Sequence, residues 1–172
     1  MSRQSESGLH EISVMRDRKL DPIDHKLLEL LQKDARMRLN KIAEILGLTI
    51  PAISHRVQKL EEAGFIKGYT AILDAKRIGK DITAFITVTA DSSKHYQMFV
   101  DRIKETEEIL ECHSVIGESS SHLLKVRTEN VNLLEGLVAR IQSWPGVLST
   151  KTNFVLSTIK ESTVLKTQKK LL

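Results

Sequence analysis

Cysteine, aromatic residues and long apolar runs are scarce in this chain of 172 residues, and each scarcity excludes a class of protein. The single cysteine, Cys112, excludes an intrachain disulfide framework and any metal site built on paired cysteines. No apolar run approaches the ~20 residues that span a bilayer, and residues 1–19 lack the apolar core of a signal peptide. These features predict a cytoplasmic protein with no membrane partner.

The net charge of +4 is unevenly distributed along the chain. Residues 1–80 carry 15 Lys and Arg against 11 Asp and Glu, whereas residues 81–172 carry 11 of each. A basic portion suits a polyanionic partner such as DNA. Many solvated surfaces carry a similar excess, so the charge alone does not separate the two interpretations.

Three helices are predicted in the first half of the chain. Asp21 is placed to cap the first, with Pro22 at the favoured first position and Asp24 able to return the capping interaction, and the helix is expected to end near Lys33. A second helix is expected over residues 39–46, with Gly47 at its end.

The third predicted helix begins after Thr49, a capping residue, and ends at Gly64, with Phe65 as the hydrophobic contact beyond it. A short helix, a tight glycine turn and a capped helix make a helix-turn-helix. With Ile53 and Val57 packed inward, the opposite face must point outward. We expect it to meet double-stranded DNA through its first turn and polar face: Thr49, Pro51, Ala52, Ser54, His55, Arg56, Gln58 and Lys59.

The members of this polar face are expected to differ in role. Arg56 and Gln58 suit base edges, Lys59 suits phosphate, and His55 alone is better explained as a polar surface residue. Arg56 could instead brace the domain against an acid such as Asp24. A helix with one polar face is usually only solvated, but here it lies in a helix-turn-helix and lacks acids until Glu61.

The second half of the chain has a different periodicity. A strand or short hairpin arm over residues 65–74 and a polar hinge over residues 75–81 are predicted before it. Strands are predicted over residues 82–90, 109–116, 122–128 and 147–159, with helices over residues 94–105 and 131–142. The order β-α-β-β-α-β is the ferredoxin-like arrangement, so the expected fold class is α+β.

Three motifs in the first half resemble the Lrp/AsnC family, the feast/famine transcription regulators. They are Leu-Asp-x-x-Asp at residues 20–24, Arg-x-x-x-Leu-Glu at residues 56–61 and Gly-x-Ile-x-Gly-Tyr at residues 64–69. The resemblance extends from Leu20 to about Ile159 and implies a winged helix-turn-helix joined to a ligand-sensing domain. It also implies homodimers that assemble into octamers, nucleoid association, and an amino-acid effector bound where dimers meet.

The residue patterns and the resemblance together divide the chain into five expected parts. They are a flexible N-terminal arm (1–19), a winged helix-turn-helix DNA-binding domain (20–74), a hinge (75–81), a ligand-sensing and oligomerisation domain (82–159) and a basic tail (160–172).

The sensing loop departs from the family pattern of a glycine followed by an Asp-aromatic pair. Serines and His122 stand in those places, and Glu118 could replace the aspartate. The ligand-binding residues that the resemblance implies, with two threonines of the last strand, are Gly117, Glu118, Ser119, Ser120, Ser121, Thr150 and Thr152. Alternatively, the serines form only a polar turn.

No enzyme site, metal site or bound cofactor is predicted. Cys112 and His113 are neighbours on a strand and point to opposite faces, so a buried structural cysteine is expected rather than a nucleophile. The six histidines lack metal-ligand spacing. The alternatives left open are an architectural, chromatin-like DNA binder, an amino-acid sensor acting on a partner protein, and a tetrapyrrole decarboxylase of the same architecture.

Overall fold

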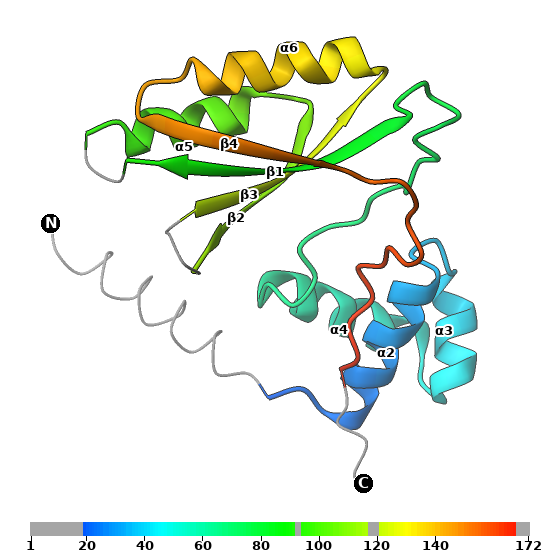
Figure 1. Cartoon of the computed structure of the whole chain (residues 1–172). Coiled ribbons are helices and arrows are strands. Elements are labelled where there is room, and N and C mark those ends of the chain that lie inside the picture. Colours follow the sequence, from blue (N-terminus) through cyan, green and yellow to red (C-terminus); the bar gives the residue numbers. More distant parts are fainter. Residues whose placement is uncertain (1–18, 92–93, 117–120, 168–172) are drawn as a thin grey trace, which may run out of the picture. The chain divides into compact units, whose positions relative to one another are not determined.

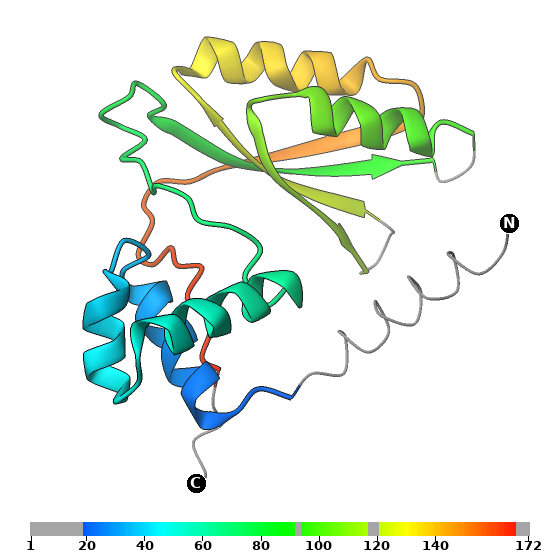
Figure 2. The same ribbon diagram turned by 180° about the vertical axis from the view of Figure 1, so that it is seen from behind.

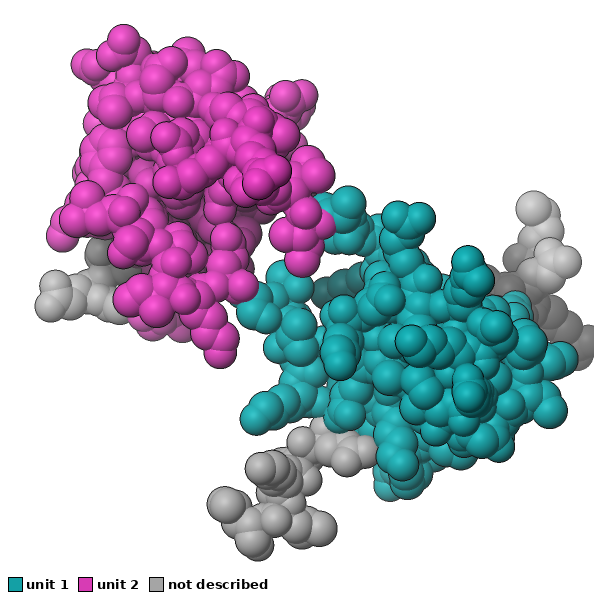
Figure 3. Space-filling model, turned by 90° about the vertical axis from the view of Figure 1, so that its right-hand side faces the viewer, with its two compact units in different colours: residues 1–71, 162–172 teal, residues 72–161 magenta. Residues whose placement is uncertain are grey.

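The computed structural model describes residues 19–91, 94–116 and 121–167 and divides the chain into two compact units (Figure 3). The first unit comprises the described parts of residues 1–71 and 162–172, and the second comprises residues 72–161. The predicted N-terminal arm lies almost wholly outside the described residues. Each unit has its own hydrophobic core.

Three helices build the first unit: α2 (Pro22–Lys33), α3 (Leu39–Leu46) and α4 (Ile50–Glu62). The predicted capping box of α2 is confirmed, because Asp21 accepts from the amide of Asp24 at 2.7 Å while Asp24 accepts from the amide of Asp21 at 3.3 Å. The apolar faces of the three helices meet in a buried core of Leu27, Leu28, Leu31, Ile42, Ala43, Ile53 and Leu60.

The turn between α3 and α4 and the end of α4 at the left-handed Gly64 form as predicted, whereas the hydrophobic contact beyond α4 differs from the prediction. Gly47 has φ of 66°, a left-handed conformation that glycine adopts without strain. Beyond α4, the predicted hydrophobic contact Phe65 is 40% exposed, and Ile66 packs against the core instead. No strand forms over residues 65–74, because an extended segment needs a pairing partner and none lies beside it in the chain described.

The C-terminal segment returns to the first unit and lies along α2. The side-chain amide of Gln32 donates to the carbonyl of Leu165 at 3.0 Å and accepts from its amide at 2.7 Å. Two turns earlier in α2, the carbonyl of His25 accepts from the hydroxyl of Thr167 at 3.4 Å. Residues 162–167 therefore belong structurally with the first unit rather than with the sheet that precedes them.

The second unit is an antiparallel sheet of four strands in the order β2-β3-β1-β4 (Figure 1). Its elements are β1 (Ile82–Ala90), α5 (Tyr96–Glu105), β2 (Ile109–Val115), β3 (Ser121–Thr128), α6 (Val131–Gln142) and β4 (Val147–Phe154). This order and connectivity confirm the predicted ferredoxin-like arrangement. Figure 2 shows α5 and α6 on the same face of the sheet, so these two helices of the second unit leave its other face open.

Along each strand, successive side chains point alternately to these two faces. Ala84, Ile86 and Val88 of β1 point into the helix-covered core, where Phe99 of α5 and Leu134 of α6 are also buried. The intervening β1 side chains, with their register partners on β3 and β4, point to the open face. This open face includes Thr83, Phe85, Thr87, Leu123, Lys125 and Arg127.

Two predictions about the edges of the sheet are corrected. The last strand ends at Phe154 rather than near residue 159, because its partner β1 begins at Ile82 and pairing stops with the bond from the amide of Val155 to the carbonyl of Thr83. Cys112 is exposed rather than buried, since β2 is an edge strand.

Candidate nucleic-acid interface and effector region

The outward face of α4 presents polar side chains free of acids until the last turn. Ile53 and Leu60 are fully buried and fix the rotation of the helix about its axis. The side chains of Ser54, His55, Gln58 and Lys59 are exposed as a result. This face offers hydroxyl, imidazole, amide and ammonium groups, which can donate to or accept from base edges and donate to phosphates.

The first turn of α4 is fixed by Thr49. Its hydroxyl accepts from the amide of Ala52 at 3.4 Å, so this oxygen is engaged in capping. Pro51 is exposed and Ala52 half-buried, which leaves a low, open surface at the helix N-terminus.

Arg56 braces the domain in this structure, in the way considered as the alternative to its predicted base-reading role. Its Nη1 donates to Asp21 at 2.7 Å and to Asp24 at 2.8 Å, and its side chain is only 27% exposed. Asp24 is 2% exposed. The guanidinium therefore neutralises a buried carboxylate and joins α4 to the start of α2.

The titration of these groups follows from the same contacts. Burial pushes the pKa of Asp21 upward, but the amide of Asp24 and the guanidinium of Arg56 outweigh it, and the pKa is lowered. The pKa of Arg56 is raised, mainly by its hydrogen bond to Asp21. Both groups are thus held in their charged forms.

Two of the predicted DNA contacts are joined to one acid at the end of α4. The amide of Gln58 donates to Glu62 at 2.8 Å, and Nζ of Lys59 lies 3.4 Å from the same carboxylate. The hydrogen bond from Gln58 and the ammonium of Lys59 lower the pKa of Glu62. All three side chains are exposed, so these contacts can exchange for contacts to a ligand at little cost.

The predicted effector residues are only partly described. Gly117, Glu118, Ser119 and Ser120 lie outside the described residues. Ser121 begins β3 and is 8% exposed.

The other two predicted effector residues, Thr150 and Thr152, lie opposite Val88 and Ile86, so they face the helix-covered side. The hydroxyl of Thr150 accepts from Gln142 of α6 at 2.7 Å. His122 pairs with Val88, so alternation places Ser121 on the opposite face from these threonines. Strand geometry therefore does not bring all three together on one face.

His122 lies directly beside this region, on the helix-covered face. Its ring centroid is 4.9 Å from that of Phe99 and 5.8 Å from that of Tyr96. Both ring nitrogens are buried with no hydrogen-bond partner among the described residues. Burial lowers the pKa of His122, so the ring is neutral near pH 7. Sequence reasoning placed His122 in the loop but not in this aromatic cluster.

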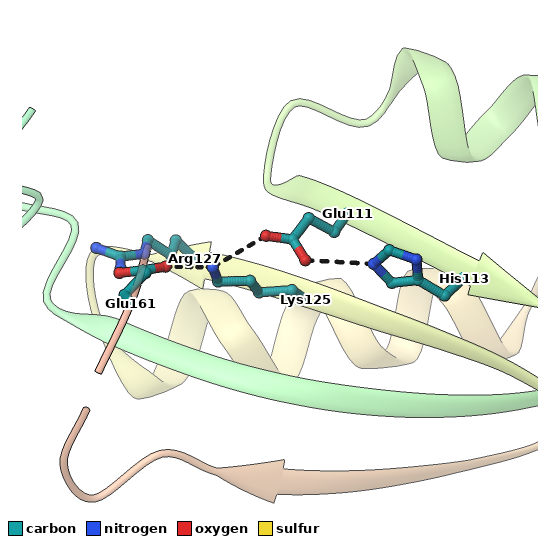
Figure 4. A network of polar contacts seen from close by, with 5 residues as sticks. All are labelled: Glu111, His113, Lys125, Arg127 and Glu161. Carbon is teal, nitrogen blue, oxygen red and sulfur yellow. Dashed lines mark hydrogen bonds and ion pairs between the residues drawn. The ribbon is translucent and has the colours of Figure 1, made fainter. Parts of the chain in front are cut away.

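A charged network on the open face of the sheet was not foreseen (Figure 4). Lys125 donates to Glu111 of β2 at 3.0 Å and also to Glu161, which follows β4. Arg127 donates to the second oxygen of Glu161 at 3.1 Å, and His113 lies 3.3 Å from Glu111. The signal in the sequence was the Lys-x-Arg spacing of β3, which places both cations on one face.

The described part of the chain shows no sign of a reactive thiol, a metal site or a membrane-spanning helix. Although Cys112 is exposed overall, partial burial raises the pKa of its thiol, which disfavours the reactive thiolate. No group of three His, Cys, Asp or Glu side chains among these residues is arranged to hold a metal ion. None of the described helices is long and apolar enough to cross a membrane.

Two family models match the chain and together account for both units. Residues 20–67 match a winged helix-turn-helix DNA-binding model, and residues 83–165 match the Lrp/AsnC ligand binding domain. The first match contains α2, α3 and α4, and the second contains the whole sheet and the segment bearing Glu161.

Named relatives cover nearly the same span. The HTH-type transcriptional regulator FL11 of Pyrococcus horikoshii is 38% identical over 146 residues, which is 85% of this chain and 95% of the relative. The leucine-responsive regulatory protein of Escherichia coli K12 is 33% identical over 154 residues, covering 87% of this chain and 93% of the relative.

Solved structures agree with this assignment. A transcriptional regulator from Neisseria meningitidis, in complex with L-methionine, matches with a TM-score of 0.81 and 29% identity over 86% of this chain and 96% of its own. LrpC of B. subtilis matches with a TM-score of 0.75 and 29% identity, over 83% and 99% of the two chains. The helix-turn-helix, the ferredoxin-like sheet and these relatives together show that the chain belongs to the Lrp/AsnC family of DNA-binding transcription regulators.

Proposed function

We propose that the polar face of α4 reads DNA in the major groove. The observation that carries this proposal is an exposed, acid-free row of Ser54, His55, Gln58 and Lys59 on the second helix of a helix-turn-helix. Gln58 meets a base edge, and Lys59 meets phosphate. Thr49, Pro51 and Ala52 bring the helix N-terminus close to the backbone, while Arg56 holds the helix in position.

The protein binds DNA as a homodimer, with dimers assembling further into octamers. Two recognition helices in successive major grooves require a roughly palindromic site with half-sites about one helical turn apart. Pairing through the second unit is supported by its open sheet face, where Phe85 and Leu123 are incompletely covered by the chain itself. The protein acts without catalysis, in the cytoplasm and on the nucleoid.

The effector is an amino acid bound where dimers meet. The match of residues 83–165 to a ligand binding domain supports this role, as does the L-methionine complex of the Neisseria relative. Ligand binding shifts assembly or DNA affinity only through unequal affinity for the two states. We expect substitutions at Gly117, Glu118 and Ser119–Ser121, or at Thr150 and Thr152, to alter the ligand response without altering bare DNA affinity.

The domain boundaries proposed for this function are residues 20–74 for DNA binding, 75–81 for the hinge and 82–159 for sensing and assembly. The N-terminal arm (1–19) and the basic tail (160–172) flank them. The tail adds cations to the DNA-binding unit, on which residues 162–167 are docked through Gln32.

Fluorescence anisotropy on DNA tests the proposal. The purified protein is titrated onto its own upstream DNA and onto a scrambled sequence at near-physiological salt, with and without a pooled amino-acid mixture. A preference for the upstream DNA that shifts with the mixture is the expected result. Equal affinity for both sequences favours an architectural DNA binder, and no binding to either contradicts the role of α4.

A further inference from the structure

The chain passes between its two units at two points. It leaves the first unit after residue 71 and returns to it at residue 162. Residues 66–81, at the first passage, contain turns but no helix or strand. A connection of this kind lets two units rotate against each other, whereas a second fixed connection restricts that rotation. The attachment of residues 162–167 to the first unit therefore bears on how freely the two units can move.

Residues 162–167, which we call the strap, are held on α2 by a pairing of backbone type. The side-chain amide of Gln32 donates to the carbonyl of Leu165 at 3.0 Å, and its oxygen accepts from the amide of Leu165 at 2.7 Å. One side chain thus satisfies both backbone groups of a residue, as a neighbouring strand would. Thr167 adds a contact two turns earlier, where its hydroxyl donates to the carbonyl of His25 at 3.4 Å. Gln32 is therefore the main attachment of the strap.

Polar contacts rather than apolar burial hold the strap in place. Val164 and Leu165 are 61% and 73% exposed. The described core of the first unit, with the apolar side chains packed against it, comes from residues 20–66. A few exposed hydrogen bonds make a modest, reversible attachment. The strap can therefore be released without unfolding the unit on which it is docked.

The position of α4 follows that of α2, the helix that carries the strap. Arg56 of α4 donates to Asp21 at 2.7 Å and to Asp24 at 2.8 Å, at the start of α2. The strap contacts α2 at His25 and Gln32, and the polar row of α4 stays exposed with the strap in place. The strap therefore leaves the recognition face open while it holds the unit that presents this face.

We propose that the strap, attached through Gln32, restricts the orientation of the DNA-binding unit, and that this restriction sharpens the preference for one spacing of DNA half-sites. The second part rests on the proposed function, in which two recognition helices enter successive major grooves. A unit whose orientation is already limited loses less freedom on binding, so it binds well only where the spacing fits. Release of the strap removes this advantage and widens the range of spacings that the protein accepts.

Distances between spin labels on the two units test the restriction without DNA. Nitroxides are attached to the natural, exposed Cys112 of β2 and to Lys41→Cys on α3, and the labelled chains are diluted with unlabelled Cys112→Ser chains so that each pair of labels lies in one chain. Gln32→Ala, or a chain that ends at Glu161, should widen the distribution of distances at least about twofold, because one connection remains. Lys26→Ala, at an exposed position of the same helix, is the control and should leave the width unchanged.

Anisotropy titrations on DNA of altered spacing test the consequence. When about two base pairs are added between the half-sites, the wild type should lose at least about fivefold more affinity than Gln32→Ala does. The proposal is wrong if neither Gln32→Ala nor the shortened chain widens the distance distribution, or if both widen it and lose as much affinity as the wild type on the altered DNA. If the wild type does not bind DNA, the proposed function fails and the spacing preference with it, while the spin-label distances still decide whether the strap restricts the unit.

Discussion

At the scale of the residue, Arg56 shows how one side chain of a recognition helix can serve the fold. Its two short bonds to Asp21 and Asp24 occupy the guanidinium on the inner side of α4, away from the exposed row. A free arginine would suit a guanine edge. Here its partner Asp24 is almost fully buried, so the arginine is needed to neutralise it.

We expect Arg56→Ala to lower the free energy of unfolding of the DNA-binding unit by about 1–3 kcal/mol, because it removes the guanidinium that neutralises the buried Asp24. Urea unfolding followed by circular dichroism measures this loss. Lys59→Ala, on the exposed face of the same helix, is the control and should change stability little. Unchanged unfolding together with lost DNA specificity would restore the base-reading role.

We expect the stability of the second unit to depend on pH through the titration of His122. Because burial lowers its pKa in the folded chain, protonation favours the unfolded chain. The contribution of the neutral ring is complete above the ordinary value of about 6.5 and is lost as the pH falls from there through the folded value.

His122→Phe should therefore flatten the loss of thermal stability between about pH 7 and pH 5. Thermal melts at stepped pH test this, with the exposed His113→Gln as the control. Parallel curves for the wild type and His122→Phe would show that His122 does not titrate in this range.

At the scale of the element, α4 carries an acid, Glu62, that pairs with its own polar face. Glu62 holds both Gln58 and Lys59 in the free protein, so DNA must displace it from these side chains. A carboxylate beside phosphates also repels them. We therefore expect the acid at the end of the helix to weaken DNA binding.

Glu62→Gln should tighten binding to any DNA by about twofold to fivefold at low salt, since it removes repulsion and releases Lys59. Anisotropy titrations at two salt concentrations measure the effect, which should shrink as salt rises. Glu135→Gln on α6 controls for the change in net charge. Weaker binding by Glu62→Gln would mean that the acid positions Lys59 productively.

Local signals in the sequence were enough to predict most elements. The caps at Asp21 and Thr49 set the starts of α2 and α4, and the alternation of Ile82–Ala90 set β1. The end of β4 could not be predicted in this way, because residues 155–159 keep the composition of a strand but have no partner beyond the start of β1.

In the candidate sites too, features that depend on local periodicity were predictable and features that depend on distant contacts were not. Helical periodicity placed the exposed row of α4, because burial of Ile53 and Leu60 fixes the opposite face. Contacts between distant residues could not be obtained from periodicity. Arg56 meets Asp21 across 35 positions and Lys125 meets Glu161 across 36, and each depends on how separate elements pack.

At the scale of the whole molecule, the important feature is the face of the sheet that α5 and α6 do not cover. A sheet face bearing Phe85 and Leu123 is suited to cover by a second copy. Leu123→Lys should therefore break dimers into monomers, because it places a charge in the contact. Light scattering after gel filtration tests this, and Leu133→Lys on exposed α6 is the control. Dimers that persist in Leu123→Lys would place the contact elsewhere.

The most direct test of the central claim is the ratio of affinities for the protein's own upstream DNA and a scrambled sequence, measured for Gln58→Ala. Gln97 of α5 is the matched control, because it also donates to an acid four residues on, Asp101 at 2.9 Å. If α4 reads DNA, Gln58→Ala lowers the ratio by about tenfold, the value of a lost base contact of roughly 1–3 kcal/mol, and Gln97→Ala leaves it unchanged. An unchanged ratio in Gln58→Ala, or an equal loss in both variants, would contradict the assignment of sequence reading to the polar face of α4.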